Sequence, residues 1–204
     1  MSFSAPFIGI NRNRLATDGF GVTTLAAFWG CPLSCYYCLN PQCGSRTSPV
    51  HIFTTEELYR HVKKDELYFL ATGGGITFGG GEPCLYPDFI HEFRTYCGKQ
   101  WSITIETCLN IPLKNIKKID PVVDQYIIDI KDLNNEIYKN YTGKNNSFLI
   151  SNLKWLTRQG RGENIKIRVP SIPDFNTEKD IQKSIELIDR IGIKDIDIFS
   201  YIIK

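Results

Sequence analysis

The sequence of 204 residues has no apolar stretch near the ~20 residues that a membrane-spanning helix needs. Its first residues, MSFSAPFIGINR, lack the basic segment and long apolar segment of a secretory signal. Neither charge is in excess, since 24 Lys and Arg face 22 Asp and Glu, and the longest basic runs are the pairs Lys63-Lys64 and Lys117-Lys118. These absences predict a soluble, cytoplasmic protein with no nucleic-acid and no membrane partner.

Internal repeats and low-complexity tracts are also absent, so the chain reads as ordinary globular sequence. Hydrophobic residues make up 42% and charged residues 23%, and a chain of this length buries roughly 70% of its unfolded surface without disulfide support. We therefore predict a single domain over residues 1–204. Within it, residues 1–20 form an N-terminal lead-in, extended over Pro6–Arg14.

Seven cysteines are present, and an odd number leaves at least one thiol outside intrachain disulfides. Four of them, Cys31, Cys35, Cys38 and Cys43, fall within thirteen residues. In a reducing compartment such a dense cluster typically binds a metal or carries redox chemistry.

Apolar runs rich in β-branched and aromatic residues alternate with amphipathic segments. The runs predict strands at Val22–Trp29, Ile76–Phe78, Ser102–Glu106, Val123–Ile130, Ile165–Val169 and Asp195–Ser200. The amphipathic segments predict helices at Thr55–Leu70, Pro87–Gly98, Leu113–Ile119, Asn135–Tyr141, Ser147–Gln159 and Thr177–Ile191. This alternation is typical of an α/β fold with parallel strands and right-handed crossovers. Because eight units need ~250 residues, we predict a partial (β/α)6 TIM-like barrel.

Polar or glycine-rich segments follow five of these strands, at the carboxyl ends where active sites of such folds lie. GCPLSCYYC follows the first strand and GGGEP the second. The next three strands lead to Glu106-Thr107-Cys108, Asp129-Ile130-Lys131 and Arg168. We expect these segments to contribute to one functional site.

The spacing Cys31-x3-Cys35-x2-Cys38 lets a short loop surround a soft metal. Zinc takes four ligands, so Cys43 would have to complete a zinc site. With three thiolates alone, a [4Fe–4S] cluster keeps one iron open for a substrate or cofactor. Inert buried thiols are the remaining interpretation.

Gly79-Gly80-Gly81-Glu82 brings a backbone that a ligand can approach closely and a carboxylate suited to an ammonium group. The segment matches neither a P-loop nor a dinucleotide-binding motif, and a plain tight turn is the alternative. Asp129 and Lys131 alternate along a predicted strand and share a face. That pair, like Arg168 on the next strand, fits either a buried ion pair or a site for a charged cofactor.

Together, the cysteine motif with an aromatic residue at Tyr37 and GGGEP one strand later resemble the radical SAM superfamily. Further segments are similar to the activating enzymes of glycyl radical enzymes, the pyruvate formate-lyase activase group. They are TDGFG at Thr17–Gly21, FWGCPLSCYYCLN at Phe28–Asn40, Thr72–Pro83, IDIKDLNNEIYKNYTG at Ile128–Gly143 and IRVPSIPDFN at Ile167–Asn176. The similarity runs from about Thr17 to the C-terminus.

The resemblance implies that Cys31, Cys35 and Cys38 ligate three irons of one [4Fe–4S] cluster, while S-adenosylmethionine chelates the fourth. It also implies a set of contacts to that cofactor: Tyr37 near the adenine; Gly80, Gly81 and Glu82 at the methionine amine; Glu106, Thr107 and Asp129 near the methionine carboxylate and a cation; Lys131 beside them; and Arg168 toward the ribose and carboxylate. The remaining cysteines, which include Cys84, Cys97 and Cys108, are expected to be structural thiols.

The implied reaction is reductive cleavage of S-adenosylmethionine to methionine and a 5′-deoxyadenosyl radical, which takes a hydrogen atom from a glycine of a partner glycyl-radical enzyme. The resemblance further implies an external one-electron donor such as flavodoxin or ferredoxin. A single cluster is expected because only Cys43 and a short loop follow the motif, where many activases carry a ferredoxin-like insert. Leu39 and Glu106 depart from the His and Asp common in that group.

Three other functions fit parts of the sequence. A radical SAM enzyme acting on a peptide or small molecule would share every motif above. A non-catalytic zinc-binding module would explain the cysteines but not the polar residues on the other strands. A thiol redox sensor needs a reactive cysteine pair, for which only Cys35 and Cys38 are suited.

Overall fold

The computed structural model describes residues 2–15, 17–45 and 49–201. Met1 and Ala16 of the predicted lead-in lie outside the described residues, as do 46–48 and 202–204. The chain divides into two compact units. Unit 1 comprises residues 1–31, 40–107 and 114–126, and unit 2 comprises residues 32–39, 108–113 and 127–204. The prediction of a single domain over residues 1–204 stays a prediction.

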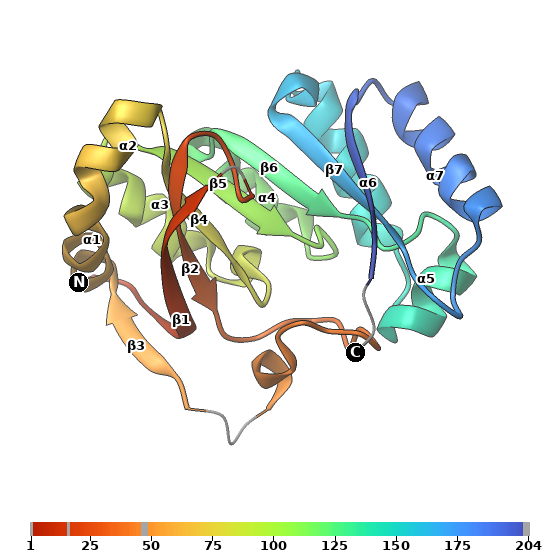
Figure 1. The fold of residues 1–204 in the computed structure, drawn as a ribbon, viewed down its shortest axis with the longest axis horizontal. Coiled ribbons are helices and arrows are strands. Elements are labelled where there is room, and N and C mark those ends of the chain that lie inside the picture. Colours follow the sequence, from red (N-terminus) through yellow and green to blue (C-terminus); the bar gives the residue numbers. More distant parts are fainter. Residues whose placement is uncertain (1, 16, 46–48, 202–204) are drawn as a thin grey trace. The chain divides into compact units, whose positions relative to one another are not determined.

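Eight strands are present among the described residues, and their hydrogen-bonded order is β3-β1-β2-β4-β5-β6-β7-β8 (Figure 1). They are β1 (Ser4–Leu15), β2 (Val22–Phe28), β3 (His51–Thr54), β4 (Gly75–Gly80), β5 (Ser102–Thr107), β6 (Gln125–Asp129), β7 (Ile165–Ser171) and β8 (Asp195–Ser200). The pairs β2–β4, β4–β5 and β7–β8 are parallel, whereas β1 runs antiparallel to both β2 and β3. All six predicted strands are therefore confirmed, and the sheet is mostly parallel.

Helices separate the strands as predicted. They are α1 (Thr55–Val62), α2 (Glu66–Thr72), α3 (Pro87–Cys97), α4 (Leu113–Ile119), α5 (Asn135–Thr142), α6 (Ser147–Arg158) and α7 (Glu178–Arg190). Local sequence explains several ends, since Thr54 and Thr177 each form a capping box with the acidic residue three positions later. Gly143 ends α5 in the left-handed conformation that glycine adopts without strain. Among the described residues no helix is both long and apolar enough to cross a membrane.

One prediction about unit 1 was wrong in detail. The expected single helix Thr55–Leu70 is broken by a 3-10 turn at Lys63–Asp65. At this turn the buried Asp65 carboxylate accepts hydrogen bonds from Arg12 of β1 and from Thr24 of β2, the latter at 2.7 Å. The lead-in is extended over Pro6–Arg14 as predicted, within the paired strand β1. Strand β3 was not predicted, because its four residues give too short a pattern.

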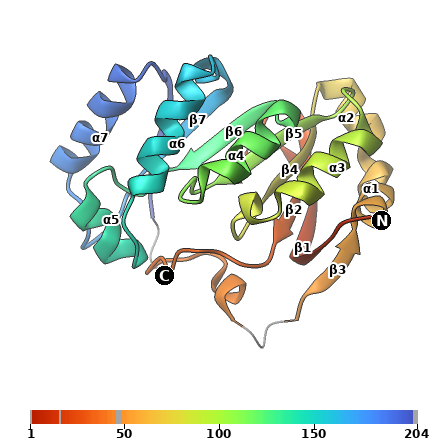
Figure 2. The same ribbon diagram turned by 180° about the vertical axis from the view of Figure 1, so that it is seen from behind.

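Aromatic side chains fill the core of unit 1. The rings of Phe7 and Phe28 stack at 4.3 Å, and Phe28 contacts Phe78 at 5.5 Å. Phe78 in turn meets Phe93 of α3 edge-on at 5.3 Å, and Figure 2 shows α3 lying over β4. This packing explains why the helix-facing side chains of β4 are large while the other face carries glycine and threonine.

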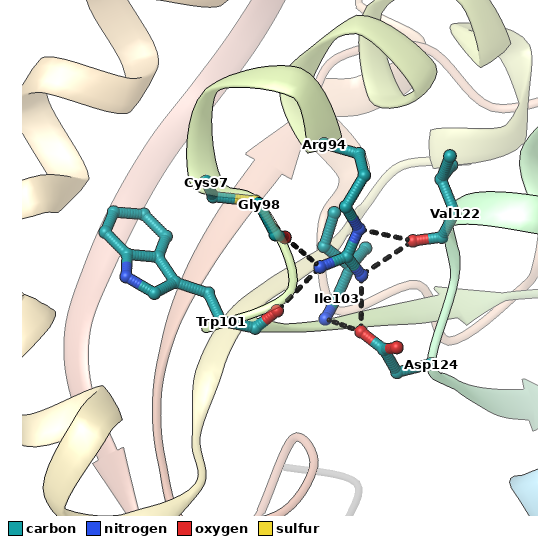
Figure 3. A network of polar contacts seen from close by, with 7 residues as sticks. All are labelled: Arg94, Cys97, Gly98, Trp101, Ile103, Val122 and Asp124. Carbon is teal, nitrogen blue, oxygen red and sulfur yellow. Dashed lines mark hydrogen bonds and ion pairs between the residues drawn. The ribbon is translucent and has the colours of Figure 1, made fainter.

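Arg94 of α3 joins three segments of unit 1 (Figure 3). Its guanidinium donates to the carbonyls of Gly98, Trp101 and Val122 at 2.7 Å each. It also pairs with Asp124, whose carboxylate accepts the N–H of Ile103 at 2.8 Å. The end of α3 is thereby fixed to the start of β5 and to the segment entering β6.

In unit 2 the backbone of β7 pairs with β8 so that Ile167 lies opposite Ile196 and Arg168 opposite Asp197. Helix α6 is anchored by Asn152, whose amide donates to the carbonyls of Leu109 at 2.9 Å and Ile111 at 2.8 Å. These contacts pair the two strands and hold α6 against the segment of residues 108–113.

Candidate active site

The predicted site residues are shared between the two units. Unit 1 holds Cys31, Gly80, Gly81, Glu82, Glu106 and Thr107. Unit 2 holds Cys35, Tyr37, Cys38, Asp129, Lys131 and Arg168.

In unit 1 the glycine-rich segment lies against the residues that precede the first cysteine. The N–H of Gly81 donates to the Phe28 carbonyl at 2.9 Å, and the N–H of Glu82 donates to the Gly30 carbonyl at 2.7 Å. A Cβ on Gly81 would lie 2.1 Å from the Gly30 oxygen, so only glycine fits. These contacts bring the GGGEP segment to the start of the cysteine motif, at Cys31.

Gly80 and Asn40 make a second connection between the two motifs. Gly80 has a φ of +88°, and a Cβ there would lie 2.6 Å from the Cβ of Ala27. Its carbonyl accepts a hydrogen bond from the Asn40 amide at 3.1 Å. The backbone of the glycine segment is thus fixed by residues on both sides of the cysteine loop.

The Glu82 carboxylate is completely buried in unit 1. It accepts the hydroxyl of Thr107 at 2.8 and 2.9 Å and the N–H of Cys84 at 2.9 Å. Asn115 of α4 donates to the Cys84 carbonyl at 2.8 Å. The carboxylate is therefore held in one orientation by the residues that follow β4 and β5.

Glu106 lies on the other face of β5. A Cβ on Gly79 would lie 2.9 Å from the Oε2 of Glu106, so this carboxylate packs against the glycine backbone of β4. The pKa of Arg14 is raised, chiefly by its hydrogen bond to Asp18 and in smaller part by the charge of Glu106. The two neighbours Glu106 and Thr107 therefore face different surroundings.

None of the seven cysteines, all of which the structure describes, forms a disulfide. Cys43 is buried, and its thiol donates to the Phe28 carbonyl at 3.6 Å. This contact favours a structural role for Cys43 and disfavours the zinc interpretation that needs it as a fourth ligand.

In unit 2 the last turn of α5 holds the cysteine loop. The N–H of Ser34 donates to the Thr142 carbonyl at 2.9 Å, and the N–H of Tyr36 donates to the Tyr141 carbonyl at 3.1 Å. These bonds lie on either side of Cys35. Helix C-termini leave carbonyls without intrahelical partners, and here the loop supplies their donors.

Tyr37 packs in an aromatic cluster of unit 2. Its ring centroid lies 6.2 Å from Tyr141, 6.1 Å from Phe175 and 6.4 Å from Tyr201. Its hydroxyl donates to Asp174 at 3.4 Å. Burial is the main cause that raises the pKa of Tyr37, and Asp174 adds to it.

Asp129 and Lys131 meet as expected, with Nζ and Oδ2 3.0 Å apart, but Lys131 lies beyond the end of β6. Its φ of +60° turns the chain after the strand. Lys131 also donates to the Tyr201 hydroxyl at 3.3 Å. Burial alone would lower the pKa of Lys131, but Asp129, then Tyr201 and Cys35, raise it well above its usual value. The ammonium therefore stays charged near Cys35.

Arg168 is half-buried on β7, opposite Asp197 of β8, and its carbonyl accepts the N–H of Ile130 at 3.2 Å. The other Asp129 oxygen, Oδ1, is buried and has no hydrogen-bond partner among the described residues. A cation or a bound donor group would satisfy that oxygen.

Sequence reasoning did not foresee the roles of Tyr141, Thr142, Asp174, Phe175 and Tyr201. Four of these lie in the segments IDIKDLNNEIYKNYTG and IRVPSIPDFN, whose similarity to the activases was visible without indicating what they contact. The structure assigns both segments to the support of the Cys35–Cys38 loop.

The family model described as the radical SAM superfamily matches residues 28–188. The chain therefore belongs to the radical SAM superfamily. It is 30% identical to the pyruvate formate-lyase-activating enzyme of Clostridium pasteurianum, over 90% of this chain and 77% of the relative. It is 27% identical to the (2S)-3-sulfopropanediol dehydratase activating enzyme of Klebsiella oxytoca, over 87% of this chain and 75% of the relative. Within the superfamily, the chain is of the glycyl-radical-enzyme activating type.

The fold is similar to that of Streptococcus suis SuiB bound to the precursor peptide SuiA, with a TM-score of 0.68 and 16% identity. The similarity covers 87% of this chain but 38% of SuiB, so this chain spans about two fifths of that protein. The predicted partial (β/α)6 barrel of the radical SAM core is confirmed at the level of fold.

Membership of the superfamily implies a [4Fe–4S] cluster and S-adenosylmethionine as cofactors. The donor set fits a cluster, because three thiols outside disulfides in one short loop are the soft ligands that iron–sulfur centres use. Among the described residues no three His, Cys, Asp or Glu side chains are already gathered as a metal site. The assignment of Cys31, Cys35 and Cys38 as ligands stays a prediction.

Proposed function

We propose that this protein holds one [4Fe–4S] cluster on Cys31, Cys35 and Cys38 and activates a partner glycyl-radical enzyme. The observation that carries this proposal is the hydrogen bond from the Glu82 N–H to the Gly30 carbonyl at 2.7 Å. It brings a buried carboxylate, suited to an ammonium group, next to the first cysteine of the motif. A zinc-binding module has no use for such an arrangement.

The protein's own residues position the cofactor and exclude water. Glu82 would accept the methionine ammonium beside the half-buried backbone of Gly80 and Gly81. In unit 2, the Lys131 ammonium and the buried Oδ1 of Asp129 provide opposite charges for the methionine carboxylate and for a cation. Arg168 adds a further positive charge, and Tyr37 offers an aromatic surface to the adenine.

A cluster held by Cys31, Cys35 and Cys38 would, once reduced, supply the electron for cleavage of S-adenosylmethionine to methionine and a 5′-deoxyadenosyl radical, which would take a hydrogen atom from the partner's glycine. The electron comes from an external donor such as flavodoxin or ferredoxin, and the reaction takes place in the cytoplasm. The relatives support this proposal, since their names describe enzymes that activate pyruvate formate-lyase and a sulfopropanediol dehydratase.

The test begins with anaerobic reconstitution of the protein with iron and sulfide. We expect dithionite and S-adenosylmethionine to yield 5′-deoxyadenosine, detected by chromatography. Addition of a glycyl-radical enzyme from the same genome should then produce a glycyl radical, detected by electron paramagnetic resonance. A Cys35→Ala variant treated in parallel controls for iron bound elsewhere.

Two results would contradict the proposal in different ways. A colourless protein that binds one zinc and no iron would show that the site is not a cluster site. Formation of 5′-deoxyadenosine without a radical on any glycyl-radical enzyme, but with consumption of a peptide or small molecule, would move the chain to another radical SAM reaction.

A further inference from the structure

Thr107, at the end of β5, donates a hydrogen bond to Glu82. Its Oγ1 lies 2.8 Å from Oε1 and 2.9 Å from Oε2 of that carboxylate. Thr107 is 2% exposed and Glu82 is 0% exposed, so water does not compete for this hydrogen bond. A hydroxyl that donates to a buried carboxylate forms a strong, charge-assisted bond.

The alternation of β5 separates Thr107 from Glu106. Ile103, Ile105 and Thr107 are buried on one face, whereas Glu106 is half-buried on the face where it meets Gly79. Adjacent residues of a strand point to opposite sides of the sheet. The side chains of Thr107 and Glu106 therefore lie on opposite faces of β5, where they would meet different groups of a ligand.

Cys84 contacts both Glu82 and Thr107. Its N–H donates to Oε1 of Glu82 at 2.9 Å, and its thiol lies 3.6 Å from the Thr107 hydroxyl oxygen. Burial and the charge of Glu82 raise the pKa of Cys84 well above its usual value. The thiol therefore stays protonated and donates a hydrogen bond to Thr107. Asn115 of α4 fixes the Cys84 carbonyl at 2.8 Å.

We propose that Thr107 is a positioning residue for Glu82, which sets the orientation of that carboxylate toward the ammonium of the methionine moiety. In this role Thr107 belongs to the ammonium-binding side of the site. The family resemblance would instead have placed it near the methionine carboxylate and a cation. The inference rests on the proposed function, because it needs S-adenosylmethionine as the ligand.

The experiment measures affinity, not turnover, by anaerobic calorimetry on the reconstituted protein. Three ligands are compared: S-adenosylmethionine, an analogue that lacks the methionine amino group, and an analogue that lacks the methionine carboxylate. The variants are Thr107→Val, which removes the hydroxyl at nearly constant shape, and Thr107→Ser, which keeps it. Thr104→Val, three residues earlier on β5, is the matched control.

Hydrogen bonds to charged groups are strong enough that we expect Thr107→Val to bind S-adenosylmethionine about tenfold to a hundredfold more weakly. The same loss should appear with the analogue that lacks the carboxylate. Affinity for the analogue that lacks the amino group should equal that of the wild type. Thr107→Ser should stay within about threefold of the wild type, and Thr104→Val should not change affinity.

The opposite pattern would overturn the inference. If Thr107→Val loses affinity for the analogue without the amino group, but not for the one without the carboxylate, Thr107 serves the carboxylate. Unchanged affinity for all three ligands would also refute its role. Should the Val variant fail to fold, Thr107→Ala carries the same comparison. If the wild type itself binds no S-adenosylmethionine, the proposed function fails and this role fails with it.

Discussion

The backbone N–H of Glu82 donates to the carbonyl of Gly30 at 2.7 Å, one residue before Cys31. This single bond joins two sequence motifs that are 52 positions apart, counted from Gly30 to Glu82. The carboxylate and the first cysteine are therefore fixed together by the backbone of unit 1, whatever side chains surround them. Close approach of the two backbones depends on glycine at position 81.

Gly81→Ala tests that close approach. The added Cβ would lie 2.1 Å from the Gly30 oxygen, so the segment must shift, and we expect a loss of about 2–4 kcal/mol in the free energy of unfolding. Gly9→Ala is the control, since a Cβ there meets nothing within 4 Å and should change stability by less than about 0.5 kcal/mol. Urea unfolding of both variants gives the comparison, and equal stabilities would show that the backbones are not in contact.

Cys35 and Cys43 should behave differently on removal. Cys35→Ala takes away one of three predicted iron ligands, so we expect loss of iron, sulfide and visible absorption after reconstitution. Cys43→Ala removes a buried thiol that bonds to the Phe28 carbonyl, and it should retain the full iron content of the wild type. A Cys35→Ala protein with normal iron would refute the three-ligand assignment.

Thiol reactivity in the cluster-free protein should follow burial. Burial raises the pKa of Cys97 to about 11, so at pH 8 only about one in a thousand of its thiols is ionised. Cys38 is exposed. With iodoacetamide at pH 8, we expect Cys38 to be alkylated at least about a hundredfold faster than Cys97, as read by mass spectrometry. In 6 M guanidinium, roughly the strength that unfolds most domains, the two rates should converge.

The Asp65 contact should make stability depend on pH. Burial by itself would raise the pKa of Asp65, but hydrogen bonds from Arg12 and Thr24, with the charge of Arg12, lower it overall. A lowered pKa stabilises the fold above the unfolded value of about 4, and this contribution is lost as pH falls through the folded value. Asp65→Asn should therefore be less stable than the wild type at pH 7, with a smaller difference near pH 3.

The control for Asp65→Asn is a substitution in the exposed ion pair of Asp88 and Lys118. Because both side chains are solvated, Asp88→Asn should change the free energy of unfolding by less than about 1 kcal/mol at either pH. A gap between wild type and Asp65→Asn that is the same at both pH values would mean that the Asp65 charge contributes nothing to stability.

Arg94 should be the most sensitive cation of unit 1, because its guanidinium contacts three backbone carbonyls and Asp124 (Figure 3). Arg94→Ala removes the guanidinium donor from all four acceptors, and we expect a loss of about 2–4 kcal/mol in the free energy of unfolding. Arg94→Lys should recover only part of it, since an ammonium lacks the planar fork. Arg60→Ala, which removes an exposed ion pair with Glu56, should lower the free energy of unfolding by less than about 0.5 kcal/mol. Thermal unfolding of the three variants gives the comparison.

Much of the fold was predictable from local pattern. The predicted start of the first long helix agrees with the capping box at Thr54 and Glu57, because capping depends on neighbouring residues. The six predicted strands were visible through their apolar runs. The break at Asp65 was not, because its cause lies in Arg12 and Thr24, which are remote in the sequence.

The candidate site likewise has features that the sequence determines and features that only the tertiary structure determines. By themselves the sequence motifs determined which thiols, glycines and carboxylate form the predicted site, since spacing within a loop is a local property. Only the tertiary structure decided that Thr107 contacts Glu82 while Glu106 faces Gly79, and that the end of α5 holds the loop around Cys35. Those relationships follow from strand register and from hydrogen bonds between distant segments, which the order of residues along the chain does not reveal.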